Sequence, residues 1–587
     1  MDIASPFRLP RKTPFGMGEH VAEWATGLKT LNKFYANRPA GGDVSAFLRF
    51  TLDVLGIQYQ VQQGNIQHIP QSGPTVVVAN HPLGCVEGVI LAEILRAVRH
   101  DVKILANQYL KTVPELDELF IGVDVFEGEK AIKANIRALR EANRHLAEGG
   151  LLLMFPAGEV SGYDKATRQI TDKTWSHSVS RLICKNKAVT VPVYIDGRNS
   201  HRFYMAGRIH PLLRTLMLGR ELLNKRDRQI NLAIGENIGY GEIKGLEERQ
   251  LVNYLRLNTY LLGCQLKKAN LRAEIILDAG EQEPVVAPMS VSDLENDIKQ
   301  LTASEHLLSS GAFEVYCATA DRIPAVMAEL GRLREINFRA VGEGTGKATD
   351  IDEFDAAYHH LFVWDSEAKC LVGAYRLGLV DQIFAKQGIN GLYSRTLFRY
   401  DERFIRQMGQ SIELGRSVIA SDYQKSLSAL MLLWKGIATF VSRHPGYTHL
   451  FGPVSISNDY SPEARHLLAD SMAFHHYDTA NAKLVAPSNP LDKGADTFWQ
   501  PDMLAALADI QLLSRVIGRL DGGKGVPVLL RQYLGLNGKL VCFNVDPDFN
   551  DALDGLIVVD LRNVPAKTLG RYMGKDEADA YLLSHQA

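Results

Sequence analysis

Short apolar runs alternate with amphipathic stretches over the first half of the chain. Apolar residues recur at helical spacing between residues 24 and 35, and Asp43 is placed to cap a second helix that ends at Gly56. The segment IQYQVQ at 57–62 predicts a strand. Further strands are predicted at 75–79, 102–106, 151–155 and 189–195, and helices at 87–98 and 132–146. This alternation is typical of an α/β layer fold.

The polar, proline-bearing segment 279–292 shows neither a helical nor a strand period, and it predicts a linker. Beyond it the pattern is mixed, which favours an α+β body around one sheet. The strands expected there are 313–318, 361–365, 372–380 and 449–456, and the helices are 323–338 and 427–443. We therefore predict a first domain at 1–280, a linker at 281–292 and a second domain at 293–587.

Composition narrows the class of protein. A chain of 587 residues is too long for one ordinary domain of about 100–200 residues. With 46% hydrophobic and 22% charged residues, it is not a disordered, collagen-like or coiled-coil chain. The six cysteines are scattered and form no CxxC pair, so we expect no zinc site, no disulfide framework and a reducing compartment.

The formal charge of −2 hides an asymmetry between the two halves. Residues 1–280 hold 36 Lys and Arg against 28 Asp and Glu, and the remainder holds 29 against 39. A basic half is compatible with an anionic membrane surface or with nucleic acid, and uneven surface charge without function explains the pattern as well. We expect membrane contact and no nucleic acid.

No segment predicts a transmembrane helix, which needs about 18–20 apolar residues without charge. The best stretch, 427–441, is interrupted by Lys435, and the start of the chain lacks the apolar run of a signal peptide. Residues 210–229 set leucines among basic residues. That pattern fits a basic amphipathic helix in a membrane interface and equally a helix packed on its own domain.

Three strand ends in the first half bear polar or turn-forming residues. The strand at 75–79 leads into Asn80 and His81, with Glu87 starting the next helix, and the strand at 151–155 leads into the turn at 156–159. The third segment is Val191-Pro192-Val193. Because the carboxyl ends of strands form the working edge of an open α/β sheet, His81 and Glu159 are expected in one cleft.

A histidine in this place has a clear chemical use. His81 can take the proton of a substrate hydroxyl, while the Glu87 carboxylate orients the imidazole. Backbone N–H groups at the Gly84 turn and the helix start are candidate donors to an oxyanion. The alternative is a histidine without function beside a glutamate that only complements the helix dipole.

These segments resemble the glycerolipid acyltransferase superfamily over about residues 70–200. The resemblance implies that His81 is the base and Glu87 its partner. It also implies an acceptor site that includes Asn80, Gly84, Phe155, Pro156 and Gly158, with Glu159 orienting the substrate.

The departures from that family pattern are informative. Five residues, not four, separate His81 from the acid; Ala157 and Val160 replace a glutamate and an arginine; and 119–124 lacks an arginine. Without these cations a phosphate-bearing acceptor is disfavoured. The pattern resembles the branch that acylates phosphate-free lipids and includes proteins labelled as hemolysins.

The second half contains a different set of charged residues: Arg334, the acidic run 350–355, Arg376, Glu413 and Arg416. The acidic run does not fit a calcium loop. It is either a solvated loop or a binding site for the ammonium group of a basic amino acid. The segment GEGTGK at 342–347 lacks the spacing of a phosphate loop and predicts a flexible turn.

Over about residues 310–565 these blocks resemble the autoinducer-synthase-like branch of the GNAT acyltransferases, especially the ornithine–acyl-carrier-protein N-acyltransferases. The resemblance implies catalytic roles for Glu413 and Arg416 on the active-site strand. It assigns Asp352 and Asp355 to the amine-substrate side, and Arg334 and Arg376 to substrate binding. It also implies an acyl thioester donor, with Lys425 and Ser426 at a helix start that receives its phosphate. No bound cofactor is expected, and the general base is left open.

The two-domain order resembles the bifunctional ornithine lipid synthases of bacteria. The resemblance implies that acyl carrier protein or coenzyme A delivers a 3-hydroxyacyl chain to ornithine, and that the lyso-ornithine lipid is then O-acylated. It also implies a cytoplasmic protein held peripherally on the inner face of the bacterial membrane. Alternatives are the same synthesis on glycine or serine, a lysophospholipid acyltransferase whose second half only binds the carrier, and a membrane-lytic protein without catalysis.

Overall fold

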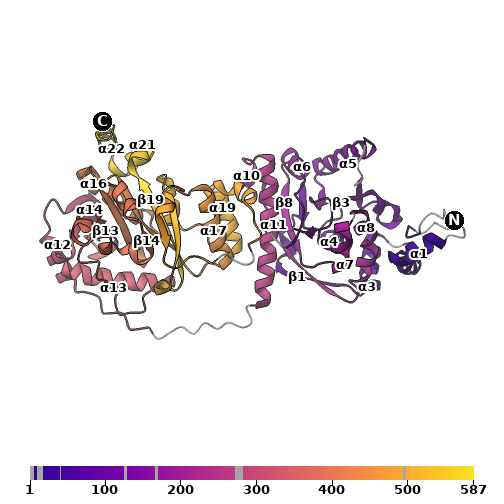
Figure 1. The fold of residues 1–587 in the computed structure, drawn as a ribbon, viewed down its shortest axis with the longest axis horizontal. Helices are drawn as coiled ribbons and strands as arrows, with labels where there is room; N and C mark the ends of the chain where they lie inside the picture. The colour runs from indigo at the N-terminus through magenta and orange to yellow at the C-terminus, as the bar shows by residue number, and fades with distance from the viewer. Residues whose placement is uncertain are drawn as a thin grey trace. The chain divides into compact units, whose positions relative to one another are not determined.

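The computed structural model describes residues 6–8, 17–39, 41, 43–124, 129–164, 169–209, 211–271, 282–492 and 497–586. The chain forms two compact units, drawn in Figure 1. The first comprises residues 1–276 and 498–512, and the second comprises 277–497 and 513–587. Part of the predicted linker, 279–281, lies outside the described residues. Residues 282–290 form no helix or strand, and Glu283 and Val286 donate backbone hydrogen bonds to Gly346 and Ala348 in the second unit.

The first unit is built on a seven-stranded sheet of order β1-β9-β8-β2-β5-β3-β4. All neighbours are parallel except β8 and β9. The strands are β1 (Gln58–Gly64), β2 (Thr75–Ala79), β3 (Val102–Asn107), β4 (Phe120–Val123), β5 (Leu151–Met154), β8 (Val189–Ile195) and β9 (Gln229–Ile234). Because β2 lies between β5 and β8, the residues that follow these three strands meet at one edge.

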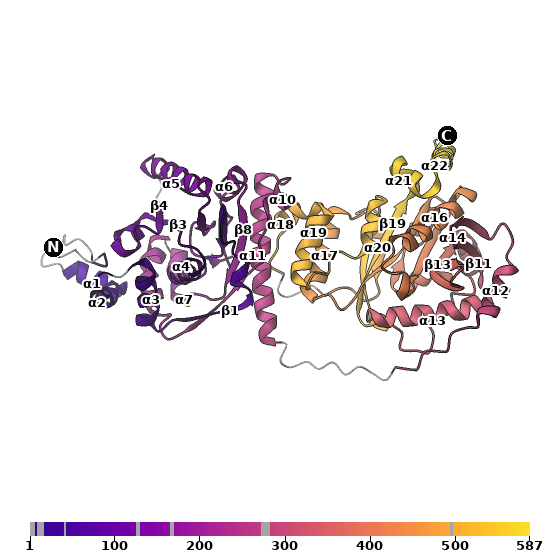
Figure 2. The ribbon, with the colours of Figure 1, turned by 180° about the vertical axis from the view of Figure 1, so that it is seen from behind.

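Helices cover this sheet, and a small hairpin extends from it. The helices are α1 (Met17–Ala25), α2 (Leu28–Ala36), α3 (Val44–Leu55), α4 (Val86–Val98), α5 (Glu129–Ala147), α6 (Ser178–Asn186), α7 (His201–Ile209), α8 (Pro211–Leu216), α9 (Leu218–Leu223), α10 (Tyr240–Ile243) and α11 (Glu248–Leu271). The hairpin is β6 (Gly162–Tyr163) with β7 (Ile170–Thr171). Helix α11 packs across β8, β9 and β1, as Figures 1 and 2 show.

The predicted cap is confirmed, and the predicted first helical segment is helical but divided into two helices. The Asp43 side chain accepts a hydrogen bond from the Ala46 N–H at 2.8 Å, and α3 ends at Gly56. The expected helix over 24–35 is broken, because Gly27 adopts a left-handed φ of 84° between α1 and α2. As a result Trp24 is 72% exposed.

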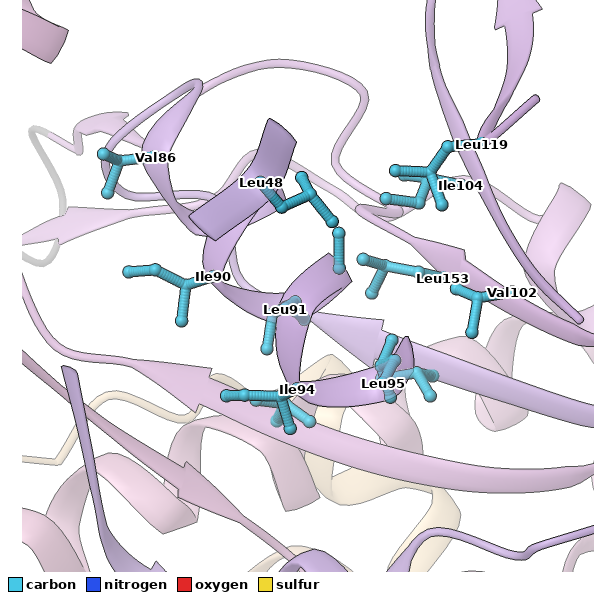
Figure 3. Close-up of a cluster of buried hydrophobic side chains, with 14 of the residues drawn as sticks. Leu48, Val86, Ile90, Leu91, Ile94, Leu95, Val102, Ile104, Leu119 and Leu153 are labelled. Carbon is cyan, nitrogen blue, oxygen red and sulfur yellow. The ribbon is translucent and has the colours of Figure 1, made fainter. Parts of the chain in front are cut away.

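A cluster of buried apolar side chains lies under α3 and α4. It includes Leu48, Ile90 and Leu91 of these helices and Leu153 of β5 (Figure 3). Burying each such side chain contributes about 1.5–3 kcal/mol. This packing fixes α4, and with it the Glu87 backbone, against the end of β2.

The second unit contains an eight-stranded sheet of order β10-β11-β12-β13-β15-β16-β19-β18. Its strands are β10 (His306–Ser310), β11 (Phe313–Thr319), β12 (His359–Asp365), β13 (Cys370–Leu379), β15 (Ser411–Ile419), β16 (His449–Ile456), β18 (Lys539–Asp546) and β19 (Ala552–Asp560). A separate pair joins β14 (Phe398–Tyr400) to β17 (Val485–Pro487). Only β15 and β16 are parallel, and among the described residues their pairing stops at Glu413 and Phe451. The two strands therefore have unpaired backbone beyond that point.

Helix α16 packs on β10 to β13, and α13 contacts β13 and β15. The helices here are α12 (Val291–Lys299), α13 (Pro324–Ala340), α14 (Val380–Gln387), α15 (Glu402–Gln407), α16 (Leu427–Arg443), α17 (Pro462–His475), α18 (Pro501–Leu504), α19 (Ile510–Leu520), α20 (Val528–Gly535), α21 (Ala566–Met573) and α22 (Lys575–Ser584). Of these, α18 and the start of α19 belong to the first unit. The predicted α/β and α+β classes are confirmed.

Two further predictions concern single segments. Residues 342–347 do form a turn, which wraps around the buried Glu335 carboxylate: the N–H groups of Thr345 and Gly346 donate to it at 3.2 and 2.9 Å. Across the described part of the chain, no helix has the length and apolar character needed to cross a bilayer.

Candidate active sites

His81 leaves the end of β2 and lies between a ring and an acid. Its imidazole stacks on Phe155, with the ring centroids 4.5 Å apart. Its Nδ1 lies 2.9 Å from Oε1 of Glu87, in the first turn of α4. The side chain of His81 is 17% exposed, whereas that of Glu87 is fully buried. The three segments predicted to meet do meet here.

The Glu87 carboxylate is held by more than the imidazole. The N–H groups of Leu83 and Gly84 donate to the same oxygen at 2.9 and 2.8 Å. Burial alone would raise the pKa of Glu87, but His81 and the backbone donors hold it below its ordinary value. The suggestion that the Gly84 turn supplies oxyanion donors is therefore wrong for these two N–H groups, because Glu87 already occupies them.

This arrangement fixes which nitrogen can react. With Nδ1 against Glu87, the other ring nitrogen, Nε2, is the one that remains for a substrate. A carboxylate at Nδ1 orients the imidazole and stabilises it once it has taken a proton. The site can therefore deprotonate a hydroxyl placed beside Phe155.

Asn80 supports this site from the sheet. Its side-chain amide donates to the Ile195 carbonyl at 3.0 Å and its oxygen accepts from the Ile195 N–H at 2.7 Å. Both polar ends of the buried amide are thus used to join the ends of β2 and β8. Its expected role in substrate binding stays a prediction.

Asp172 is a buried residue that the sequence analysis did not single out. Its carboxylate accepts from the His81 N–H at 3.2 Å, the Ser161 hydroxyl at 2.6 Å and the Trp175 indole at 3.0 Å. Ser161 also donates its N–H to the His81 carbonyl at 2.7 Å. Asp172 therefore ties the His81 turn to the loop that follows β5.

A second buried network supports the same turn from the other side. The Asn199 amide donates to the Pro82 and Leu83 carbonyls at 3.2 and 3.3 Å. The Lys225 ammonium donates to the Asn199 oxygen at 3.0 Å and lies 3.6 Å from Glu221. Burial lowers the pKa of Lys225 despite that carboxylate. No spacing in the sequence links these residues to His81.

The turn after β5 contains the remaining predicted residues. Pro156 is buried and its carbonyl accepts from the Ser176 N–H at 2.9 Å, while Gly158 is exposed with a left-handed φ of 70°. Glu159 forms ion pairs with Arg214 and, at 2.5 Å, with Lys173. Burial would raise the pKa of Glu159, but these two cations hold it below its ordinary value.

The segment 210–229 does not form one amphipathic helix. His210 lies outside the described residues, α8 and α9 are separate short helices around Met217, and β9 begins at residue 229. Leu216 of α8 is 57% exposed. Leu222 and Leu223 of α9 instead pack against the apolar core.

In the second unit, the predicted charged residues form one buried network. Arg334 donates to Asp355 at 2.9 Å, and Arg376 donates to Asp352 and Asp355 at 2.6 and 3.2 Å. Arg416 donates to Asp352 at 3.2 Å. Burial would raise the pKa of Asp355, but the two guanidinium groups hold it well below its ordinary value.

The acidic run is therefore not a solvated loop. Asp350 and Asp355 are each 3% exposed, and Asp350 lies 2.9 Å from Nε of Arg416. Because three arginines compensate these carboxylates, the run has little negative charge left to attract an ammonium group.

Glu413 lies at the point where β15 and β16 separate, and both oxygens of its carboxylate accept hydrogen bonds. Its carboxylate accepts from the Tyr358 hydroxyl and from the N–H groups of Ser394 and Tyr393 at 2.7 and 3.2 Å. Burial, and then Glu413 itself, raise the pKa of Tyr358 well above its ordinary value. Arg416, three residues further along β15, has a φ of 49° and stacks over Tyr393 and Phe549 at 4.7 and 4.9 Å.

A second acidic group, not predicted from the sequence, lies within electrostatic reach of Arg416. Burial and mutual repulsion raise the pKa of Asp554 to about 8 and that of Glu343 to about 7, and burial raises the pKa of Asp546. The Ser455 hydroxyl donates to Asp554 at 2.6 Å. Among the described residues, no basic side chain lies within ion-pair distance of these three carboxylates.

The two residues expected to receive a donor phosphate lie at the start of α16. Ser426 caps the helix by accepting the Ser428 N–H at 3.3 Å, and Lys425 is exposed. Their proposed role stays a prediction.

Two family models match separate parts of the chain. Residues 37–269 match the family described as acyltransferase, and residues 333–435 match the acetyltransferase (GNAT) domain. A solved structure, the 1-acyl-sn-glycerophosphate (LPA) acyltransferase PlsC of Thermotoga maritima, is 17% identical. It covers 41% of this chain and 88% of its own with a TM-score of 0.22, too low to support an inference.

Two relatives come from Phocaeicola vulgatus. A glycine N(alpha)-acyltransferase is 30% identical over 298 residues, which are 48% of this chain and 90% of that protein. A lyso-glycine lipid O-acyltransferase is 27% identical over 199 residues, which are 33% of this chain and 68% of that protein. With both domain types present, the chain is an N- and O-acyltransferase that belongs to the family of these N(alpha)-acyltransferases.

Proposed function

We propose that this chain makes an N,O-diacylated amino-acid lipid in two steps. The second domain, about residues 293–587, transfers a 3-hydroxyacyl chain from acyl carrier protein to the α-amine of ornithine. The first domain, about residues 1–280, then acylates the 3-hydroxyl of the resulting lyso-lipid. The observation that supports this most is the His81–Glu87 pair, held against Phe155 at the edge of the sheet.

The O-acyl transfer follows from this pair. Nε2 of His81 removes the proton of the lyso-lipid hydroxyl as its oxygen attacks the thioester carbonyl. The carbon–sulfur bond breaks, and the imidazolium returns the proton to the departing thiol. Glu87 stays ionised throughout, because the backbone N–H groups of Leu83 and Gly84 and the imidazole stabilise its charge.

The N-acyl transfer takes place where β15 and β16 separate. Strand edges without partners bind amide groups, so the unpaired backbone beyond Glu413 suits the arm of a carrier-bound thioester. The free amine attacks the thioester carbonyl, the amine loses a proton and the thiol leaves. Lys425 and the capped start of α16 are proposed to hold the donor phosphate.

The head group is proposed to be ornithine, because a second amine needs uncompensated negative charge. The run at 350–355 is less suited to this, since three arginines already pair with its three aspartates. Glu343, Asp546 and Asp554 can acquire it when an ammonium group binds, because the described residues include no cation already paired with these carboxyl groups. Glycine is the second candidate, because both relatives from P. vulgatus are named for it.

Peripheral membrane attachment is part of the proposal. Ile209 of α7 is 75% exposed and follows the basic residue Arg208 of the same helix, and Leu216 of α8 is 57% exposed. Apolar side chains next to cations suit an anionic bilayer surface. Flotation of the purified chain with vesicles of anionic and of neutral lipid tests this, and we expect binding to the anionic vesicles only.

Expression in a host without amino-acid lipids tests the synthesis. We expect mass spectrometry of total lipid to reveal a new phosphate-free, ninhydrin-positive lipid whose hydrolysis releases ornithine. Release of glycine instead would mean that the head group is glycine, and the two-step synthesis would still hold. If intact protein yields no new amino lipid, the two-step proposal is wrong; if phospholipid acylation survives Glu413→Ala unchanged, the second domain only binds the carrier.

A further inference from the structure

An arginine without a predicted catalytic or binding role contacts the loop that follows β5. Arg214 of α8 reaches the loop after β5 and pairs with Glu159, and its Nη1 lies 3.5 Å from where a Cβ of Gly162 would stand. Its side chain is 16% exposed and that of Glu159 is 32% exposed. Lys173 adds a second cation on the solvent side, with its side chain 71% exposed.

The charge of this cluster is unbalanced. Two cations share one carboxylate, so Glu159, Arg214 and Lys173 together have a charge of +1. Among the described residues, Glu159 is the one acceptor within hydrogen-bond distance of the Arg214 guanidinium. Other N–H groups of the five in that guanidinium are therefore available to an anion.

The cluster is connected to the His81 turn through the loop that follows β5. Ser161, two residues after Glu159, donates its N–H to the His81 carbonyl at 2.7 Å. Val160 lies between them, and its side chain is 3.4 Å from where a Cβ of Gly84 would stand. The loop that holds Arg214 in place therefore forms one wall of the His81 turn.

We propose that Arg214, assisted by Lys173, binds the free carboxylate of the lyso-lipid acceptor, so that the O-acyl site selects an N-acylated amino acid over a neutral lipid alcohol. This inference rests on the proposed function and specifies the substrate class of its second step. It explains how a site without the phosphate-binding arginines of its family still recognises an anionic head group.

The reach of the substrate fits this role. Six covalent bonds separate the 3-hydroxyl oxygen from the carboxylate carbon of an N-(3-hydroxyacyl) amino acid, which is about 7 Å when extended. The two chain steps from Ser161 to Glu159 span a similar distance, at most about 7 Å. In the proposed binding mode the hydroxyl lies beside His81 and the carboxylate reaches the Glu159–Arg214 pair. Being planar and always charged, the guanidinium can bind it with two parallel hydrogen bonds.

Two acceptors distinguish this role from a structural ion pair: N-(3-hydroxyacyl)ornithine and its carboxamide, which keeps the shape and removes the negative charge. For the wild type, we expect kcat/KM to be about 10–100-fold higher with the acid than with the carboxamide, the usual contribution of a hydrogen bond to a charged group. Arg214→Ala should remove this preference, chiefly by raising KM for the acid. Its activity on the carboxamide should change less than about threefold, and Arg214→Lys should lie between the two.

Arg181→Ala is the matched control. Arg181 on α6 forms an exposed ion pair with Glu248, so its loss also removes one arginine–glutamate pair from the same unit. We expect it to leave both acceptors unaffected. If Arg214→Ala lowers activity on acid and carboxamide equally, Arg214 only holds the loop and the inference is wrong; equal wild-type activity on both acceptors also overturns it. If the wild type acylates neither, the proposed function fails instead.

Discussion

The two units use buried charge in opposite ways. In the first, the acid is buried and the base is not: the Glu87 side chain is fully buried while that of His81 is 17% exposed and keeps one ring nitrogen for a substrate. In the second, both partners are buried. Arg334 and Arg376 are fully buried, and each donates to the 4%-exposed Asp355 side chain. The first arrangement suits proton transfer, and the second suits holding a fold.

Within the second unit, carboxylates also differ in their hydrogen-bond and ion-pair partners. The Glu413 carboxylate already accepts three hydrogen bonds, whereas Asp554 accepts one from Ser455 and has no cation beside it in the described structure. The two carboxylates therefore differ in how far the surrounding protein satisfies them. We therefore expect the resemblance-derived residues of the second unit to act mainly through architecture, and those of the first through chemistry.

His81→Ala gives the largest effect and tests the chemical side of the comparison. Loss of the base should lower O-acyl transfer by about 10³-fold or more, because general-base catalysis contributes about 10²–10⁴-fold. N-acyl transfer should continue, so the mono-acylated lipid accumulates and is measured by mass spectrometry of the lipid extract. His100→Ala, an exposed histidine of the same unit, is the control. Normal di-acylated lipid from His81→Ala contradicts the assignment.

Asp355→Ala tests whether the buried charge network stabilises the second unit. Removing this carboxylate strips Arg334 of its ion-pair partner and Arg376 of one of two, in a fully buried place. We expect the free energy of unfolding of the second unit to fall by about 3–5 kcal/mol. Denaturant titration of the full chain, with tryptophan fluorescence, measures this.

Asp401→Ala is the control for Asp355→Ala. Asp401 pairs with Arg403, whose side chain is 75% exposed, and such surface pairs contribute about 0–1 kcal/mol. An equal effect of the two substitutions would mean that the buried network has no structural role.

Much of the first site could be predicted from the sequence because it is local. His81 and Glu87 lie on one strand–turn–helix segment, and the rule that strand ends share one edge brought Phe155 to them. Residues joined only by tertiary packing gave no such signal. Asp172 is 91 positions from His81, and Arg214 is 55 positions from Glu159.

The periodicity of apolar residues predicted long helices well and predicted the boundaries between elements poorly. The predicted helix at 427–443 agrees with α16 residue for residue, because it has one continuous apolar face. Gly27 interrupts a good helical period, and only its left-handed backbone shows that the helix ends there. The acidic run at 350–355 was misjudged for a different reason: its compensating arginines come from α13, β13 and β15.

Glu87→Gln sharpens the assignment of His81. The amide keeps the shape and can still accept from the backbone N–H groups of Leu83 and Gly84, but it has no charge to stabilise the protonated imidazole. We expect O-acyl transfer to fall by about 10²-fold, less than for His81→Ala, with N-acyl transfer unchanged. Single-step assays with a purified lyso-lipid acceptor measure each activity separately. A variant as active as the wild type would mean that Glu87 only fixes the turn.

Asp554→Asn gives the smallest effect and shows whether the second unit also has a reactive, unpaired group. Burial, followed by Asp546 and Glu343, raises the pKa of Asp554 from an ordinary 3.8 to about 8. As pH rises from about 4 to about 8, the unfolded chain loses this proton while the folded chain keeps it, so the wild type loses stability. The asparagine variant avoids this loss. We expect it to match the wild type near pH 4 and to exceed it by about 1–3 kcal/mol near pH 8.

The same titration tests the head group. An ammonium group bound at Asp554 compensates the carboxylate, so saturating ornithine should shrink the stability gap at pH 8, whereas glycine should not. Thermal denaturation across pH, with Asp579→Asn as an exposed control on α22, measures the gap with and without each amino acid. A gap that stays constant with pH would show that Asp554 is compensated in the folded protein. The second unit would then have no free negative charge with which to distinguish ornithine from glycine. In that case only the first unit would contain an acid that takes part in the chemistry.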